Sequence, residues 1–342
     1  MSSPIHLRRA VVPLVLALAL VATAACSKDK DEATAAAPAA STRYPLTGLP
    51  VNDPATASRP TLFVKIDNEP GAFPQVGLND ADLVYEEMVE GNYTRLLSVF
   101  QSRNADPLGP VRSVRPTDPS LVAPFGGLFG YSGGTDRFIN LLRETPGITD
   151  VGVGNVPDAY PRRSIHSIPH NQYTSTQKLY DAGPPGIPAP PPFSPFLAPG
   201  EPFAPPGAAP ATKVSVPFGG ITASWDWDAG AGVWKRSHDG QPDVLEGGEP
   251  VTATTVIVQF VPYEPVPGAT DTVGAQVVDA KLTGGTGEAW ILAQGLVFKG
   301  QWSKPEMTSV IAYTDAAGQS VAIPPGRTWI ELPPNGAPAT TA

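Results

Sequence analysis

The sequence has almost no cysteine, no excess of positive charge and no apolar run long enough to cross a membrane as a helix. Its single cysteine, Cys26, excludes a disulfide bond within the chain. The formal net charge of -9 at pH 7 excludes a general nucleic-acid-binding protein, because such proteins need a basic surface. The apolar stretch at residues 10–25 is shorter than the roughly 20 residues of a membrane-spanning helix. The 42 prolines and 34 glycines argue against a helical bundle.

The N-terminal segment has the pattern of an export signal. Arg8 and Arg9 precede the apolar stretch, which ends in Ala24-Ala25-Cys26 and resembles a bacterial lipobox. We therefore predict a lipoprotein signal peptide at residues 1–26. Acylation of Cys26, with palmitate among the acyl chains, would anchor the protein on the extracytoplasmic face of the cell membrane. A cleaved signal followed by an incidental cysteine is the alternative.

The sequence of the remaining chain predicts two domains, together with a tether, a connector and a tail. Residues 27–43 are polar and aperiodic and predict a disordered tether. Residues 44–183 alternate between strand-like and helix-like patterns, which indicates a mixed α/β layered domain. Residues 184–210 are rich in proline and predict an extended connector, although three phenylalanines there indicate some packing. Residues 211–334 predict a mostly β domain, a sandwich or open barrel, and residues 335–342 a disordered tail. The fold class is thus α+β.

The richest stretch of the sequence is a predicted hairpin with an unusual number of charges. Residues 82–90 and 93–101 read as two strands that meet at Gly91-Asn92, a typical hairpin turn. Because neighbouring side chains alternate across a strand, Glu86 and Glu87 cannot face the same way, whereas Glu86 and Glu90 can. Either these charges cover a solvated face or they line a site. The candidate ligand-binding residues in and around the hairpin are Asp67, Asn68, Glu86, Glu90, Thr94, Arg95, Arg112, Ser113, Arg115, His170 and Asn171.

Several runs of sequence resemble one bacterial family. They lie at residues 59–70, 75–102, 109–116 and 168–176, and a further run, PPGRTWIELPP, lies near the C-terminus at residues 324–334. These runs resemble the YerB-like lipoprotein family across about residues 45–334. The resemblance implies an envelope lipoprotein with two family domains. It implies no reaction, because the family has no established biochemical activity.

Three kinds of chemistry are possible around the candidate residues. Gly130-Tyr131-Ser132-Gly133-Gly134 matches the nucleophile elbow of hydrolases, with Asp150, Asp158, His166 and His170 following in the chain. The acidic residues and His170 are possible metal ligands, but metal-binding spacings are missing, so we predict neither metal nor cofactor. The third possibility is an anion site, because the planar fork of arginine matches phosphate or carboxylate. The alternative reading of the same arginines is a structural brace that pairs with the hairpin glutamates.

We predict that the protein binds an anionic component of the envelope, such as a cell-wall precursor, or an envelope partner protein. Arg95 should point toward Arg112 and Arg115, with Glu86 or Glu90 as counter-charges. An envelope hydrolase or glycopolymer-processing enzyme is one alternative. A structural or scaffold lipoprotein is the other.

Overall fold

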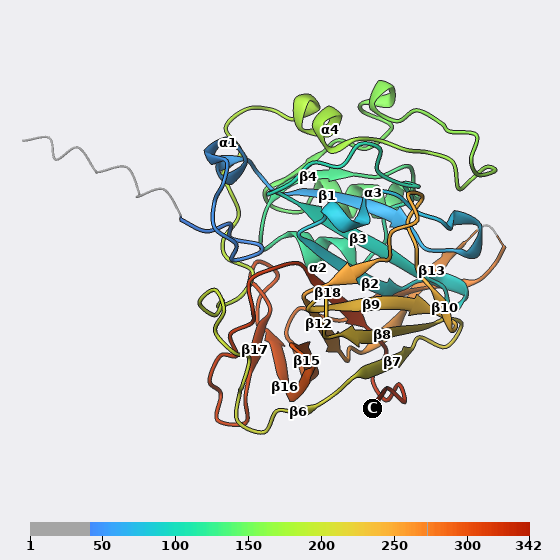
Figure 1. Ribbon diagram of the computed structural model, residues 1–342. Coiled ribbons are helices and arrows are strands. Elements are labelled where there is room, and N and C mark those ends of the chain that lie inside the picture. The colour runs from blue at the N-terminus through green and yellow to red at the C-terminus, as the bar shows by residue number, and fades with distance from the viewer. Residues whose placement is uncertain (1–41, 272) are drawn as a thin grey trace, which may run out of the picture. The chain divides into compact units, whose positions relative to one another are not determined.

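The computed structural model describes residues 42–271 and 273–342 (Figure 1). Cys26, the predicted signal peptide and most of the predicted tether lie outside these residues. Within the first half, strands and short helices are interspersed along the chain, as the sequence predicts. The elements of this half are α1 (Pro54–Ser58), β1 (Leu62–Asp67), β2 (Leu83–Met88), β3 (Thr94–Phe100), α2 (Asp118–Val122), β4 (Gly127–Gly130), α3 (Asp136–Arg143), β5 (Ile148–Asp150) and α4 (Thr176–Ala182).

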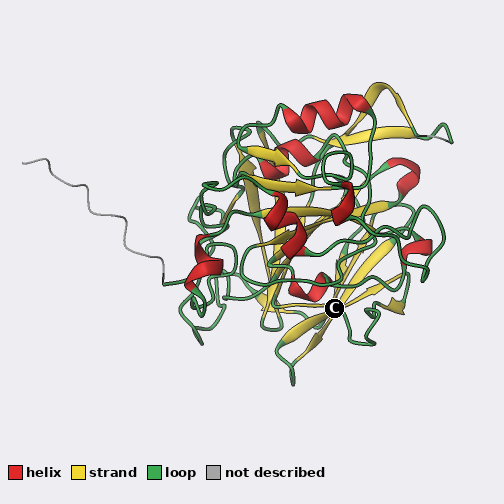
Figure 2. Cartoon of the chain, turned by 90° about the horizontal axis from the view of Figure 1, so that it is seen from above, coloured by secondary structure: helices red, strands yellow, loops and turns green. Residues whose placement is uncertain are grey.

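The second half is built from strands. Across the described chain, strands (yellow) predominate over helices (red) in Figure 2. The mixed first half and the mostly β second half confirm the predicted fold class. The strands of the second half are β6 (Ala209–Pro210), β7 (Lys213–Pro217), β8 (Thr222–Asp228), β9 (Val233–His238), β10 (Gln241–Pro242), β11 (Thr252–Ala253), β12 (Thr255–Gln259), β13 (Tyr263–Thr270), β14 (Gln276–Ala280), β15 (Gly285–Ala293), β16 (Leu296–Lys304), β17 (Ala312–Thr314), β18 (Thr328–Leu332) and β19 (Thr340–Thr341).

The two halves share one sheet of 11 strands. Its order is β17-β16-β15-β12-β18-β2-β3-β1-β4-β5, with β6 paired to β16. The junction is β18 of the second half, which pairs in parallel with β2 of the first (Figure 1). At this junction Trp329 lies opposite Val84, and Glu331 lies opposite Glu86. The halves that the sequence presents as two domains therefore meet inside a hydrogen-bonded sheet.

Each face of the shared sheet has its own core, because successive side chains of a strand point to opposite faces. On one face a second sheet, β10-β9-β8-β7-β19 with β11 on β9, packs through its tryptophans. There the rings of Trp225 and Trp329 are 5.2 Å apart and meet edge to face. On the other face Tyr85 and Leu97 pack with Phe138 and Leu142 of α3. Five of the six tryptophans are buried and so serve packing: Trp225, Trp234, Trp290, Trp302 and Trp329.

The connector and the C-terminal tail are both ordered against the rest of the chain. Phe193 and Phe203 of the proline-rich connector are each only 1% exposed, and the connector ends in β6. Its three phenylalanines thus do indicate packing. The tail corrects a prediction, because β19 within residues 335–342 pairs with β7. Two short backbone pairings leave little trace in a tail that has no large apolar residue.

Candidate functional site

The predicted hairpin is present and is closed by the predicted turn. Gly91 and Asn92 have φ values of 70° and 60°, a left-handed conformation that glycine and asparagine tolerate best. In the antiparallel register Glu87 lies opposite Arg95, and Glu86 lies opposite Leu96. Glu86 and Glu87 consequently point to opposite faces of the shared sheet, as the sequence predicts. The hairpin therefore distributes its charges between two different environments.

On the face of the sheet that carries Glu87 and Arg95, three predicted arginines line one pocket. Arg95 comes from β3, whereas Arg112 and Arg115 come from the irregular segment before α2. The cavity has a volume of about 580 Å³, and Ser113 and Glu90 also line it. We call it the arginine pocket. Glu69, which the sequence analysis did not select, is a further lining residue.

Carboxylates hold the three arginines in place. Glu69 Oε1 accepts from Arg95 Nη2 at 2.6 Å and from Arg112 Nη2 at 3.0 Å. Arg115 donates to both carboxylate oxygens of Glu90, with 2.8 Å from its Nε to Oε2. In addition, Asp67 Oδ2 is 2.9 Å from Arg112 Nε. Three carboxylates therefore face three guanidinium groups, and the local charge is close to balanced.

The balance leaves Arg95 incompletely satisfied. Its side chain is 3% exposed, and its nearest approach to Asp67 is 3.9 Å, beyond hydrogen-bonding distance. Within the described part of the chain, Arg95 Nε and Nη1 have no acceptor. Burial and the positive charge of Arg115 lower the pKa of Arg95, against the opposing charge of Asp67. A buried cation with two unpaired donor atoms is costly unless another group pairs with them.

The pKa values of the acidic partners shift in the opposite sense from what burial alone would cause. Burial acts to raise the pKa of Glu69, but the charge and hydrogen bonds of Arg95 and Arg112 outweigh it, and the pKa is lowered. Burial also opposes the lowered pKa of Glu90, where the hydrogen bond and charge of Arg115 dominate. Both glutamates are therefore ionised at neutral pH and act as internal anions for the arginines.

His170 reaches this group through Asp67. Its Nδ1 is 2.8 Å from Asp67 Oδ2, and the ligand atoms of Asp67, Glu69 and His170 lie within 4.8 Å of one another. Such a trio has the composition of a metal site. However, Arg95 and Arg112 contact the same two carboxylates, and their positive charges would repel a cation. The surroundings thus suit an anion better than a metal ion.

Three predicted residues lie instead on the opposite, enclosed face of the sheet. Asn68 and Thr94 both donate to Glu86 Oε1, at 3.1 and 2.8 Å. Glu86 Oε2 accepts from Arg236 Nη2 of β9 at 2.6 Å, across the junction of the two halves. Glu86 is thus a partner of Arg236 and does not balance the pocket arginines, which corrects one of the two expected counter-charges. The alternation that places Glu86 with Glu90 fails because the chain leaves strand geometry at Glu90–Asn92.

Asn171 belongs to neither group. Its Oδ1 accepts from Arg162 Nη1 at 2.5 Å, on the exposed loop before α4.

A second set of buried charges, which the sequence did not predict for the site, is joined to the arginine pocket through Arg115. Lys65 bonds to Glu87 and is 2.7 Å from Asp118 Oδ1, while Asp118 Oδ2 accepts from the backbone N–H of Arg115 at 2.6 Å. Burial, opposed by the charge of Lys65, raises the pKa of Glu87 to about 7.

The residues of the hydrolase pattern serve other contacts. The Ser132 hydroxyl donates to the carbonyl oxygen of Val111 at 2.9 Å. Asp150 accepts from the Tyr131 hydroxyl at 2.9 Å and from Arg143 Nε at 2.7 Å. His166 Nε2 lies 3.2 Å from the carbonyl oxygen of Pro74. These contacts do not assemble a serine–histidine–acid arrangement among the described residues, and the elbow pattern gains no support.

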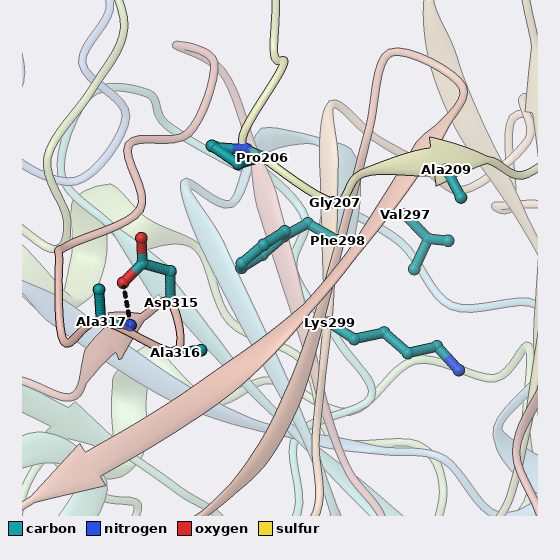
Figure 3. Close-up of a pocket in the computed structure, with 9 residues that line it drawn as sticks. All are labelled: Pro206, Gly207, Ala209, Val297, Phe298, Lys299, Asp315, Ala316 and Ala317. Carbon is teal, nitrogen blue, oxygen red and sulfur yellow. Dashed lines mark hydrogen bonds between the residues drawn. The ribbon is translucent and has the colours of Figure 1, made fainter.

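A second cavity, of about 410 Å³, lies beside β16 and the end of the connector (Figure 3). Its two charged lining residues are already engaged. Lys299 Nζ lies 3.8 Å from the ring centroid of Trp290, and Asp315 Oδ1 accepts from the backbone N–H of Ala317 at 2.9 Å. Figure 3 draws the latter bond as a dashed line. The arginine pocket is therefore the stronger candidate for recognition.

Comparisons with known proteins place the chain in a family with two parts. Residues 46–185 match the family described as "Protein of unknown function (DUF3048) N-terminal domain". Residues 214–330 match the corresponding C-terminal domain. The chain belongs to this two-part, YerB-like family, as its sequence motifs predict. Among the residues that the structure describes, no helix is both long and apolar enough to span a bilayer.

Two comparisons concern one protein of Bacillus subtilis (strain 168). The chain is 28% identical over 305 residues to "Putative lipoprotein YerB", which covers 87% of this chain and 88% of that protein. It is also similar to the crystal structure of YerB protein from Bacillus subtilis, with a TM-score of 0.74 and 24% identity. That match covers 88% of this chain and 100% of the crystallised one. The relative's fold is therefore shared, and its name is that of a lipoprotein of no stated activity.

Proposed function

We propose that the protein is an envelope lipoprotein that binds an anionic envelope component in the arginine pocket. Anchoring through acylated Cys26, on the extracytoplasmic face of the cell membrane, is part of this proposal. It is supported by the lipobox-like sequence and by the name of the Bacillus subtilis relative. The pocket is formed by both halves of the chain, because Thr270 and Val277 of the second half also line it.

One observation carries the proposal more than any other. Arg95 is buried beside a cavity with two donor atoms, Nε and Nη1, that have no acceptor within the described chain. A phosphate or carboxylate group would supply such acceptors and would match the planar fork of the guanidinium. Arg112 and Arg115 line the same cavity and would add attraction for the anion.

The competing explanation is that the cluster braces the fold. Its support is the pairing of the arginines with Asp67, Glu69 and Glu90. Under this explanation Arg112 mainly stabilises the protein, whereas under ours it mainly binds. A substitution of Arg112 distinguishes the two explanations, because the Arg112 side chain is 17% exposed and both of its carboxylate partners also bond to other residues.

The test compares Arg112→Ala with the unaltered protein in a thermal-shift titration with phosphate, pyrophosphate and teichoic-acid fragments. We expect ligand to raise the melting temperature of the unaltered protein. The substitution should weaken binding by about tenfold to a hundredfold, as expected for a lost hydrogen bond to a charged group. Its own melting temperature should change by no more than about 2 °C, equivalent to about 1 kcal/mol in a protein of this size.

Arg163→Ala is the matched control, because Arg163 also pairs with a glutamate, Glu246, and does not line the pocket. It should leave ligand binding unchanged. No ligand-dependent shift in the unaltered protein, together with a large loss of stability in Arg112→Ala, would support the brace and overturn the binding site.

A further inference from the structure

The arginine pocket has a second chemical character on its other side. Besides its charged residues it is lined by apolar side chains from three separate elements of the chain. These are Tyr93 after the hairpin turn, Phe138 of α3, and the side chains of the β13–β14 hairpin, Val273, Ala275 and Val277. Its charged lining consists of three arginines and of three carboxylates, Glu69, Glu90 and Asp271, so the cavity combines guanidinium donors with apolar surface within one volume of about 580 Å³.

Two of these side chains are unusually open to water. Tyr93 is 43% exposed and Val273 is 86% exposed, and only six large apolar residues of the described chain are exposed to this degree. A single exposed apolar side chain is common and needs no explanation. Two of them beside a cavity that also holds unsatisfied cationic donors form a surface that a suitable ligand would cover.

We propose that the ligand of the arginine pocket is an amphiphile, an organic phosphate that carries an apolar chain or group. This inference rests on the proposed anion-binding function and specifies its ligand. The phosphate contacts Arg95 and Arg112, and the apolar group covers Tyr93 and Val273. A phosphate attached only to a polar group would leave the apolar side of the pocket exposed to water.

The position of Glu69 shows where the phosphate binds. Its Oε1 accepts from both Arg95 Nη2 and Arg112 Nη2, so one internal oxygen bridges two guanidinium groups. Glu69 is only partly buried, with its side chain 23% exposed. It lies after the end of β1 and directly before the short 3-10 helix Pro70–Ala72, of which it is the N-cap residue. A phosphate oxygen replaces this carboxylate oxygen and reaches the free donors of Arg95, while Glu69 moves toward solvent.

The test measures how affinity depends on the apolar group. Methyl phosphate and octyl phosphate, kept below its aggregation concentration, are titrated into residues 41–342 by calorimetry, with octyl glucoside as the uncharged ligand of equal chain length. This span is suitable because it forms one compact unit and corresponds in extent to the crystallised relative. Burial of one methylene strengthens binding roughly fourfold. We expect octyl phosphate to bind at least about tenfold more tightly than methyl phosphate, or about 1.4 kcal/mol.

Variants assign the effect to the two sides of the pocket. Tyr93→Ser and Val273→Ser should each reduce the advantage of octyl over methyl phosphate by about threefold or more, a larger loss than either causes in methyl phosphate affinity, because methyl phosphate has no chain to cover these side chains. Val244→Ser is the matched control, since Val244 is 45% exposed and does not line the pocket. Arg112→Gln should weaken both phosphates. All four side chains are partly or largely exposed, and melting curves will confirm that each variant folds.

The outcomes separate the two proposals. If methyl and octyl phosphate bind equally, the pocket binds anions and the proposal of an amphiphilic ligand is wrong. If neither binds, the anion site itself is wrong. If octyl phosphate binds but Arg112→Gln, Tyr93→Ser and Val273→Ser leave it unchanged, or octyl glucoside binds as tightly, the chain adheres elsewhere and the amphiphile proposal is also overturned.

Discussion

The two faces of the β2–β3 hairpin carry similar charged residues and use them in different ways. On one face Arg95 lies beside a cavity with Glu69 and Asp67. On the other, Arg236 bonds to Glu86 and Asp243 and lies 5.1 Å from the ring centroid of Trp329. We call these the pocket face and the enclosed face. The second sheet covers the enclosed face, and this covering is what distinguishes them.

The comparison shows that an unsatisfied donor alone does not define a site. Arg236 Nε also has no acceptor within the described chain, although its side chain is only 1% exposed. No ligand can reach Arg236 at this buried position, so its unpaired Nε is an energetic cost that the surrounding packing offsets. Arg95 differs because its side chain lines a cavity of about 580 Å³. Access, together with charge, is therefore what makes the pocket face a candidate for binding.

The largest expected effect comes from separating the halves. The domain boundaries predicted from the sequence imply that residues 44–183 and 211–334 fold alone. The shared sheet favours the opposite result, because separation exposes the central strands β2 and β18 and removes Arg236 from Glu86. We expect both fragments to lack the near-UV circular dichroism signal of the intact chain. A fragment of residues 44–183 with a native-like spectrum and a cooperative melt would contradict this expectation, since the contacts of the enclosed face would then not be required for folding.

Sequence reasoning finds the hairpin but not the partner of its outer strand. The Gly91-Asn92 turn and the alternating strands are local features, and the structure confirms them. The pairing of β2 with β18 joins residues about 245 positions apart and has no local signal. For the same reason Arg236 reads as an ordinary polar position on a solvated strand. Its burial depends on which sheet covers which face, and that is decided only in the folded chain.

The candidate site is predictable to a similar extent. The three arginines were selected from their type and clustering, and the structure brings Arg95, Arg112 and Arg115 to one pocket. Glu69 was missed although it ends the polar run that follows β1, because any residue of such a run is equally a turn former. Tyr93 and Val273 were missed because exposed apolar side chains have no distinguishing pattern in a sequence.

The next effect compares one arginine from each face. Arg236→Ala leaves Glu86 and Asp243 buried without their cation, and we expect a loss of about 3–5 kcal/mol in the free energy of unfolding, typical of a broken buried ion pair. Arg112→Ala should cost about 1 kcal/mol or less, because Asp67 and Glu69 keep other partners. Urea unfolding of both variants measures the difference. Equal losses would mean that the pocket face is as structural as the enclosed face.

The last effect concerns the pH dependence of stability, in which Glu69 and Glu90 of the arginine pocket and Glu331 of the enclosed face have opposite signs. On the pocket face the pKa values of Glu69 and Glu90 are lowered in the folded state, so their contribution is present above the unfolded pKa and is lost as pH falls. On the enclosed face burial and the charge of Glu86 raise the pKa of Glu331 well above its ordinary value. Its contribution is therefore present in acid and is lost as pH rises through the folded pKa.

Glu331→Gln tests the enclosed face because glutamine resembles the neutral acid that the folded protein holds there. While Glu331 is protonated only in the folded state, it should make the unfolding free energy fall by about 1.4 kcal/mol per pH unit. The difference between the unaltered protein and Glu331→Gln, from urea unfolding between pH 5 and 8, should show this slope. The exposed Glu249→Gln serves as the control and should show a flat difference. A flat difference for Glu331→Gln as well would show that Glu331 is ionised in the folded protein, with Arg236 sharing its charge among Glu86, Asp243 and Glu331.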